Sequence, residues 1–247
     1  MKKKIVSKKN FLSILAANAR SMNKNKNIFN KATKLLELSD KYMFIHQNKY
    51  FGEPSINLGD DLMRIQEAIY LTKPDYVIEV GTCWGGTTLF LSNVLEGIGH
   101  GKVIGIDIFI PNTMRKRIMN KGKLSKRIKL YQESSTSINI KQKLDKILRK
   151  KKCLIILDSD HTEKNVLDEL EFYANYTSKN SYIIVCDTIL NFIKPNKKRI
   201  RPWNKTNNPY TALQKFLKKN KSFKLDKNIN SRLLLSCNYF GFLKRVK

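Results

Sequence analysis

From residue 76 onward, short apolar runs rich in Val and Ile alternate with stretches of helical periodicity, and this alternation constrains the fold more than any other feature. Runs that are apolar throughout, rather than at every second position, indicate strands that are buried on both faces. The alternation therefore predicts an α/β fold, in which helices cover both faces of a mostly parallel sheet. The strands are expected at residues 76–80, 102–107, 128–131, 153–158 and 182–187.

Helices are expected between these strands and before them. The segments 86–97 and 162–176 carry apolar residues at helical spacing, and residues 31–47 have the same pattern. Further on, Asp60 and Asp61 precede another apolar-periodic run, which ends before Pro74. Acidic residues at the start of such a run are typical of a capped helix.

The C-terminal segment breaks the alternation. After a helix around Phe216, two β-rich runs follow at 231–237 and 239–245. A late pair of strands on a mostly parallel sheet is typical of class I methyltransferases, and a plain dinucleotide-binding fold lacks it. We therefore predict a Rossmann-like class I methyltransferase fold, with a seven-stranded sheet and a C-terminal antiparallel strand.

The net charge is +28, from 48 basic and 20 acidic residues. Such a field attracts phosphates, nucleic acid and anionic membrane surfaces. Yet 38 of the basic residues are Lys and only 10 are Arg, the residue on which specific nucleic-acid recognition depends most. A general surface bias is therefore favoured over a nucleic-acid partner, and peripheral contact with an anionic membrane stays open. No feature of the sequence indicates an oligomeric state.

The chain divides by composition into two parts. Residues 1–36 hold ten basic residues and no acidic one, and we expect a basic, partly helical arm that could contact an acidic surface or simply be mobile. Residues 37–247 are expected to form the methyltransferase domain, with N-terminal helices at 37–74. No run of 18 or more apolar residues predicts a membrane span.

The four cysteines form no CxxC pair, which argues against a disulfide scaffold and a zinc ribbon. A reducing, cytoplasmic location is expected.

A glycine-rich turn follows the first strand, in the stretch from Glu79 to Thr87. Its spacing is G-x-x-x-G-G, at Gly81, Gly85 and Gly86, and differs from the dinucleotide pattern G-x-G-x-x-G. Glycines let the backbone approach a ligand closely. S-adenosylmethionine (SAM) has no phosphates to cradle, and Glu79 is expected to accept its ammonium group, directly or through water. A tight strand–helix turn without a ligand is the alternative.

Acidic residues follow three further strands. Asp107 ends the second strand, 26 residues after Gly81, where a carboxylate accepts ribose hydroxyls. Asp158, Asp160 and Asp187 follow the fourth and fifth strands, and hard divalent ions such as Mg²⁺ prefer carboxylates. Helix capping explains Asp160 equally well, but it does not explain Asp187. A cation site is therefore expected at this edge.

Four stretches, together with the lead-in at 51–75, resemble the cephalosporin hydroxylase and rhamnosyl O-methyltransferase family, over roughly residues 44–246. The resemblance implies a class I SAM-dependent methyltransferase that methylates a hydroxyl, often on a sugar or natural product, with a divalent metal in some members. The stretches are VIEVGTCWGGTTLFLSNVL (77–95), GKVIGIDI (101–108), LDSDHTEKNVLDELEFYANYTSKNSYIIVCDT (157–188) and YFGFLKR (239–245).

The resemblance also assigns residues to roles. It implies a metal set of Asp158, Asp160 and Asp187, which bind Mg²⁺ or another divalent cation. His161 lies where more distantly similar catechol-type enzymes place a basic residue, so His161 or Asp160 is expected to remove the hydroxyl proton. The cofactor-binding residues are Glu79, Gly81, Thr82, Gly85, Gly86, Asp107, Ser134, Ser135 and Asp158, the two serines near the adenine.

One position departs from the family pattern. The family typically has Glu-Asp-Thr after the fifth strand, whereas this chain has Cys186 before Asp187. A thiolate is a poor ligand for Mg²⁺. The site therefore holds metal with fewer carboxylates, prefers another ion, or has lost the metal.

We expect a SAM-dependent O-methyltransferase whose acceptor is a small molecule or a glycan, for example a saccharide hydroxyl on a surface glycan or its precursor. Three alternatives stay open: an RNA methyltransferase, suggested by the basic stretches 112–152 and 194–227; a binding protein on a decayed methyltransferase fold, suggested by Cys186; and a nicotinamide-dependent oxidoreductase, against which the glycine spacing counts. The basic loop 197–203, which includes Trp203, could close over an anionic or glycosyl substrate, or be a solvated insertion.

Overall fold

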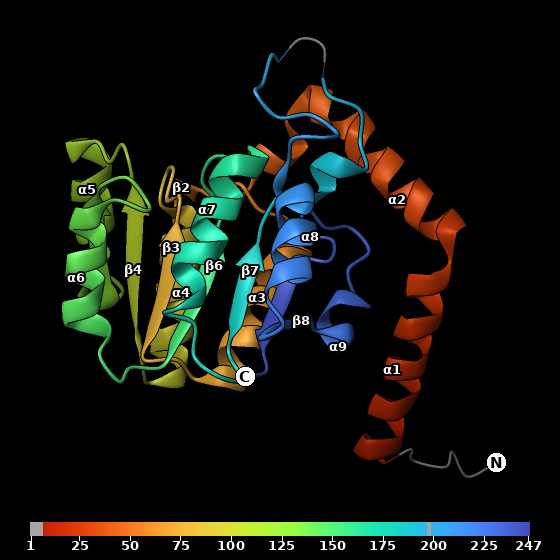
Figure 1. The fold of residues 1–247 in the computed structure, drawn as a ribbon, viewed down its shortest axis with the longest axis horizontal. Helices are drawn as coiled ribbons and strands as arrows, with labels where there is room; N and C mark the ends of the chain where they lie inside the picture. Colours follow the sequence, from red (N-terminus) through yellow and green to blue (C-terminus); the bar gives the residue numbers. More distant parts are fainter. Residues whose placement is uncertain (1–6, 197–198) are drawn as a thin grey trace.

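The computed structural model describes residues 7–196 and 199–247 (Figure 1). The start of the expected arm and part of the expected loop 197–203 lie outside the described residues. Seven strands form the main sheet, in the order β5-β4-β3-β6-β7-β9-β8. They are β3 (Tyr76–Val80), β4 (Lys102–Asp107), β5 (Ile128–Gln132), β6 (Cys153–Leu157), β7 (Tyr182–Val185), β8 (Phe223–Leu225) and β9 (Phe242–Arg245).

The predicted topology is confirmed. The strands from β3 to β7 pair in parallel, and β9 runs antiparallel to both of its neighbours, β7 and β8. The chain winds outward from β3 to β5 in one direction and from β6 to β7 in the other. The strand order therefore reverses between β3 and β6, the point at which open α/β sheets bind their ligands.

Helices cover both faces of the sheet, as expected. Alternate residues of each strand point to opposite faces, so one strand contributes side chains to a core on each face. In β3, Val77 joins the core with α3 (Gly59–Thr72), α4 (Gly86–Ile98) and α5 (Asn112–Met119). Its neighbours Ile78 and Val80 join the core on the other face, with α6 (Ile138–Leu148), α7 (Glu163–Ala174) and α8 (Pro209–Lys219). A further two-stranded sheet pairs β1 (Lys49–Tyr50) with β2 (Glu53–Pro54).

The expected strand at 231–237 is wrong. This segment is irregular and follows the short helix α9 (Lys227–Asn230), while β8 lies earlier than expected. The reason is a buried carboxylate in α3. Asp61 accepts hydrogen bonds from the Ser236 hydroxyl and, at 2.8 Å, from the Cys237 backbone N–H. An N–H bonded to a side chain is not available to a strand partner, so these β-rich residues do not extend the sheet.

The N-terminal region is helical from Lys8. It comprises α1 (Lys8–Lys24), α2 (Lys26–Ser39) and two 3₁₀ turns, η1 (Asp40–Tyr42) and η2 (Phe44–Gln47). The single helix expected over 31–47 is therefore wrong beyond Ser39, where a left-handed residue, Met43 with φ +54°, separates the two turns.

The proposed division at residue 36 lies inside α2. This helix packs on the body of the protein, because Ala32 and Leu36 are buried and the Phe29 ring contacts Phe192 and Tyr239. By contrast, α1 extends away from the sheet (Figure 1), and several of its apolar side chains are exposed.

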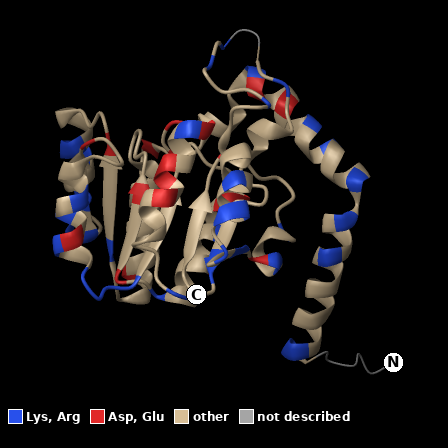
Figure 2. Cartoon of the chain, in the orientation of Figure 1, with Lys and Arg blue, Asp and Glu red and all other residues tan. Residues whose placement is uncertain are grey.

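Lys and Arg are spread over several helices, α1, α2, α6 and α8 among them, which agrees with a general surface bias (Figure 2). Among the described residues, no helix combines the length and the apolar character needed to cross a membrane.

The Asp61 carboxyl is fully buried, and burial raises its pKa to about 7. A raised carboxyl pKa means that the folded protein holds a proton that the unfolded chain releases at lower pH. Stability from this group is therefore present at low pH and is lost as the pH rises through about 7.

We expect Asp61→Asn to flatten this pH dependence. The free energy of unfolding of the unmodified protein should fall between pH 5 and pH 8 by roughly 2 kcal/mol more than that of the variant. Urea denaturation at several pH values measures the difference, and the other titrating groups cancel because both proteins contain them. The exposed neighbour Asp60 supplies the matched control, Asp60→Asn. An equal slope for Asp61→Asn and the unmodified protein would contradict the assignment.

Candidate functional site

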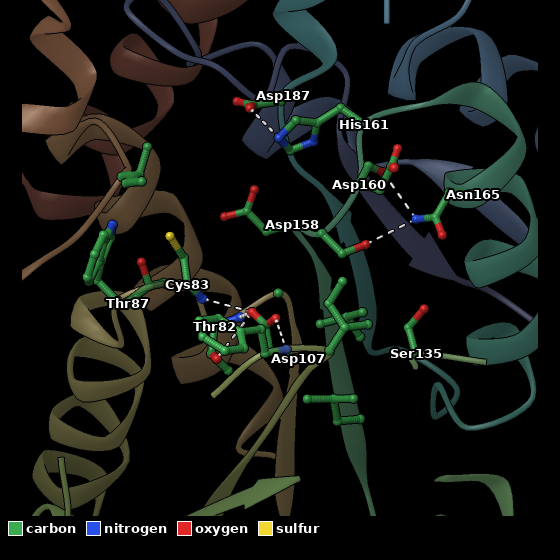
Figure 3. Close-up of a pocket in the computed structure, with 18 of the residues that line it drawn as sticks. Thr82, Cys83, Thr87, Asp107, Ser135, Asp158, Asp160, His161, Asn165 and Asp187 are labelled. Atoms are coloured by element: carbon green, nitrogen blue, oxygen red, sulfur yellow. Dashed lines mark hydrogen bonds and ion pairs between the residues drawn. The ribbon is translucent and has the colours of Figure 1, made fainter. Parts of the chain in front are cut away.

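A cavity of about 720 Å³ lies at the carboxyl ends of β3, β4 and β6, where the strand order reverses (Figure 3). Within the described part of the chain, its lining contains five acidic residues and neither Lys nor Arg, although the chain has 48 basic residues. A cavity lined in this way attracts cations and repels anions. The five acidic residues are Asp107, Glu133, Asp158, Asp160 and Asp187.

The loop after β3 forms the floor of the cavity. Gly81 lies there with φ +92°, and a Cβ atom on it would be 2.1 Å from the carbonyl oxygen of Asp158. Only glycine permits this approach between the loops that follow β3 and β6. The glycine thus brings the two halves of the sheet together beneath the cavity.

Asp107 holds the same loop from β4. Its Oδ2 accepts hydrogen bonds from the backbone N–H groups of Thr82, at 2.9 Å, and Cys83, at 3.0 Å (Figure 3). Its Oδ1 accepts a third, from the Phe109 N–H at 3.0 Å. The carboxylate is therefore fixed at the cavity wall, and it occupies two loop amides that a phosphate-binding turn would offer to its ligand.

Three residues that were expected to bind a cofactor do not line the cavity, namely Glu79, Gly85 and Gly86. Successive residues of β3 point to opposite faces, so Glu79 points toward α4, where the Thr88 hydroxyl donates a hydrogen bond to its carboxylate. Burial raises the pKa of Glu79 to about 8. Glu79 therefore does not line the cavity, and the contact with the SAM ammonium group that the sequence led us to expect, directly or through water, stays a prediction.

Gly85 and Gly86 are the other two. A Cβ atom on Gly85 would lie 2.6 Å from the Ile118 side chain, and one on Gly86 would lie 2.3 Å from the Pro54 carbonyl oxygen. Both glycines therefore let α4 begin tightly against α5 and β2. Their role is close packing beside the cavity, rather than the ligand contact that the sequence led us to expect.

Ser134 and Ser135 line the cavity after β5, as expected for residues near a bound ligand. The Ser135 carbonyl oxygen accepts a hydrogen bond of 2.6 Å from the Tyr173 hydroxyl, which holds this loop against α7. The same wall includes two exposed apolar side chains that sequence reasoning missed, Ile108 and Phe109, 75% and 68% exposed. The sequence signal that could have identified them is an apolar pair directly after a carboxylate at the end of a strand.

A metal-binding arrangement lies at the opposite end of the cavity. One donor atom from each of Asp158, His161 and Asp187 lies within 4.8 Å of the others, and we call these three residues the triad. The His161 Nε2 is 3.1 Å from Asp187 Oδ2 (Figure 3). Burial and the charge of Asp187 hold the pKa of Asp158 well above its usual range. A bound cation would offset this unfavourable proximity of two carboxylates.

The triad differs at one residue from the metal set expected from the sequence, which stays a prediction. Asp160 lines the cavity but is not part of the triad, and His161 takes its place. The Asp160 Oδ1 instead accepts a hydrogen bond of 2.7 Å from the Thr162 N–H, just before α7 begins. Thr162 is the N-cap residue of α7, so this bond belongs to a turn that precedes the helix, and Asp160 does not cap α7.

Cys186 does not line the cavity. Val185 belongs to the core on the α6–α8 face, and the next side chain, Cys186, belongs to the core on the α3–α4 face. Burial raises the pKa of its thiol well above the usual value. Cys186, the residue that departs from the family pattern, therefore lies in the core as a neutral thiol, and it is not one of the triad residues.

Asn57 is a site residue that the sequence did not indicate. It is buried in the lead-in to α3, it lines the cavity together with Asp158, and its side chain donates a hydrogen bond of 3.1 Å to the Thr87 hydroxyl. An Asn in a loop far from Asp158 along the chain carries no pattern that would have singled it out.

Comparison with known proteins places these observations in a family. The family model described as Rhamnosyl O-methyltransferase/CmcI matches residues 42–246. The rhamnosyl O-methyltransferase of Mycobacterium leprae (strain TN) is 30% identical over 145 residues, which cover 58% of this chain and 61% of that protein. The chain thus spans only about three fifths of the length of the curated relatives that it matches.

Two solved structures of CmcI are similar in fold. An apo structure has a TM-score of 0.59, and one described as containing Mg and SAM has 0.56. Each is 16% identical, and the matches cover 82% of this chain and 77% or 78% of the other. The family match extends over most of the chain and includes every residue of the cavity wall, so this protein belongs to the Rhamnosyl O-methyltransferase/CmcI family.

Proposed function

We propose that this protein is a SAM-dependent O-methyltransferase with a sugar hydroxyl as acceptor and a divalent cation bound at the triad. The observation that carries the proposal is the acidic lining of the cavity in a strongly basic protein. Acidic side chains gathered in one concave site select cationic ligands. A sulfonium cofactor and a divalent cation are both cationic.

The shape and the donors of the cavity suit SAM. When bound, SAM supplies an electrophilic methyl group on a positively charged sulfur. Asp107 would accept the ribose hydroxyls, and Gly81 and Thr82, which line the floor, would contact the methionine part. Ser134 and Ser135, with the apolar wall at Ile108 and Phe109, would hold the adenine. Asp158 lines the same cavity and would interact with the ammonium group.

A nicotinamide cofactor suits the cavity less well. Its pyrophosphate needs free loop amides or cationic side chains. The amides of Thr82 and Cys83 are bonded to Asp107, and neither Lys nor Arg lines the described cavity. These contacts favour the methyltransferase over the oxidoreductase.

The triad suits a divalent cation. Two carboxylates and one imidazole offer two oxygen donors and one nitrogen, without a thiolate. Oxygen donors suit Mg²⁺ and Mn²⁺, and an imidazole extends the range to Fe²⁺ and Zn²⁺. A cation bound there lowers the pKa of a hydroxyl that coordinates to it. Asp158, His161 and Asp187 would hold that cation at the cavity wall.

The chain itself must also remove a proton from the acceptor. If His161 is a ligand of the cation, it is not free to act as a base. Asp160 is then the remaining carboxylate in this part of the cavity wall, and it is exposed. We propose that Asp160 accepts the hydroxyl proton and passes it to solvent.

The name of the Mycobacterium relatives, rhamnosyl O-methyltransferase, supports a sugar as the acceptor class. We propose a saccharide hydroxyl on a glycan or on its precursor. All four cysteines are free thiols, and three of them are buried, which agrees with the reducing, cytoplasmic location that we propose.

Calorimetric titration of SAM into the purified protein tests the cofactor assignment. We expect Asp107→Asn to weaken SAM binding about tenfold to a hundredfold, since it removes the charge that accepts the ribose hydroxyls. Glu79→Gln should change the affinity less than about threefold, because Glu79 points away from the cavity. Equal losses in both variants would contradict the two placements. No binding of SAM to the folded protein would overturn the proposed function.

Titration with Mn²⁺, followed by electron paramagnetic resonance, tests the cation site. Asp158→Asn, Asp187→Asn and His161→Gln should each weaken binding at least about tenfold, because each removes one donor. Asp160→Asn is the matched control. It keeps an oxygen that can accept the Thr162 N–H and should leave the Mn²⁺ affinity unchanged. A loss with Asp160→Asn as large as with Asp187→Asn would restore the metal set expected from the sequence.

A further inference from the structure

Between η4 (Thr188–Asn191) and α8, the structure describes residues 192–196 and 199–208, which we call the connecting segment and which include residues near the end of α2 (Figure 1). Its first half is attached to the N-terminal helices. The Lys194 N–H donates to Glu37 Oε2 at 2.9 Å, and the Arg199 guanidinium donates to Asp40 Oδ1 at 3.0 Å. These contacts join residues more than 150 positions apart in the sequence.

The second half of the segment is attached to α7. The Asn207 side chain accepts a hydrogen bond of 2.8 Å from the Glu163 N–H and donates one of 2.9 Å to the Pro202 carbonyl oxygen. Between the two attachments lies Trp203, whose ring meets the His161 ring edge to face, with centroids 4.9 Å apart. An indole is thereby placed directly beside the triad.

The two arginines of this segment differ in their partners. Arg199 forms an ion pair with Asp40, and its second nitrogen lies 3.3 Å from His46 Nε2. Its charge is therefore compensated, and its role is to attach the segment. Arg201 is exposed and has no ion-pair partner among the described residues, and its guanidinium lies 5.4 Å from the centroid of the Trp203 ring.

Arg201 also lies close to the triad. Its guanidinium lies 5.4 Å from the centroid of the Trp203 ring, and the centroid of the His161 ring lies 4.9 Å from the same ring. Both the guanidinium and a triad residue therefore contact one indole. A cation without an ion-pair partner among the described residues therefore lies near a cavity whose described lining has five acidic residues and neither Lys nor Arg.

We propose that Arg201 and Trp203 form an acceptor subsite that recognises an anionic substituent, a phosphoryl or carboxylate group, on the sugar that is methylated. The proposal rests on the proposed function and specifies its substrate class. The five acidic side chains of the cavity would repel an anion, so the anion must lie outside the cavity while the sugar hydroxyl reaches the triad. A guanidinium pairs with phosphate or carboxylate through two parallel hydrogen bonds, and an indole offers a flat apolar face to a sugar ring.

Titration of the full-length protein with α-D-glucose 1-phosphate, D-glucuronate and D-glucose tests the subsite and distinguishes the two anions. We expect at least one of the anionic sugars to bind at least about tenfold more tightly than glucose. Arg201→Gln should remove that advantage, and Arg201→Lys should retain part of it, because a lysine keeps the charge but not the bidentate geometry. Trp203→Ala should weaken all sugars that bind, and Trp203→Phe should restore most of the loss.

Lys205→Gln is the matched control, since it removes one positive charge from an exposed position of the same segment. It should leave every affinity within about twofold of the unmodified protein. The proposal is overturned if Lys205→Gln and Arg201→Gln have equal effects, if Arg201→Gln has none, or if the unmodified protein prefers neither anion. SAM binding, measured on the same samples, separates the two hypotheses. Its absence would overturn the proposed function, whereas sugar binding that is independent of Arg201 would overturn only the subsite.

Discussion

The site depends first on one close approach of backbone, between Gly81 after β3 and Asp158 after β6. A Cβ atom on Gly81 would meet the Asp158 carbonyl oxygen at 2.1 Å, so any other residue would push the two loops apart. The contact lies where the strand order reverses, and it therefore sets the distance between the part of the cavity formed by Asp107 and the part formed by the triad. The Asp107 carboxylate stabilises the same loop by accepting hydrogen bonds from the backbone N–H groups of Thr82 and Cys83.

The cavity gathers negative charge within a protein that carries +28 overall. Asp158 and Asp187 lie close together, and burial adds to the cost of ionising Asp158, so its pKa is raised. Such a site is most stable with a cation in it, and this physical requirement links the proposed cofactor, the proposed metal and the absence of basic residues from the described lining. The proposed anion-binding pair lies outside the acidic wall for the same reason.

Much of the fold could be predicted because burial on both faces leaves a direct mark, the continuous apolar runs that became β3, β4, β6 and β7. The prediction failed at 231–237, where the same β-rich composition occurs. There, a buried carboxylate 175 positions away, Asp61, binds Ser236 and Cys237. Composition reports how well a segment suits a strand, but it does not report which distant group will bind its amides.

The sequence by itself determined the parallel part of the sheet, the alternation of its strands with helices and the edge at which the candidate site residues gather, because these follow from periodicity and from strand ends. Only the tertiary structure decided which side chains meet. Asp160 and His161 are neighbours in the chain, yet Asp160 accepts a hydrogen bond from the Thr162 N–H before α7, whereas His161 lies with Asp158 and Asp187. Glu79 points into the core because alternate residues of a strand point to opposite faces. The position of α4 there makes Thr88 its hydrogen-bond partner.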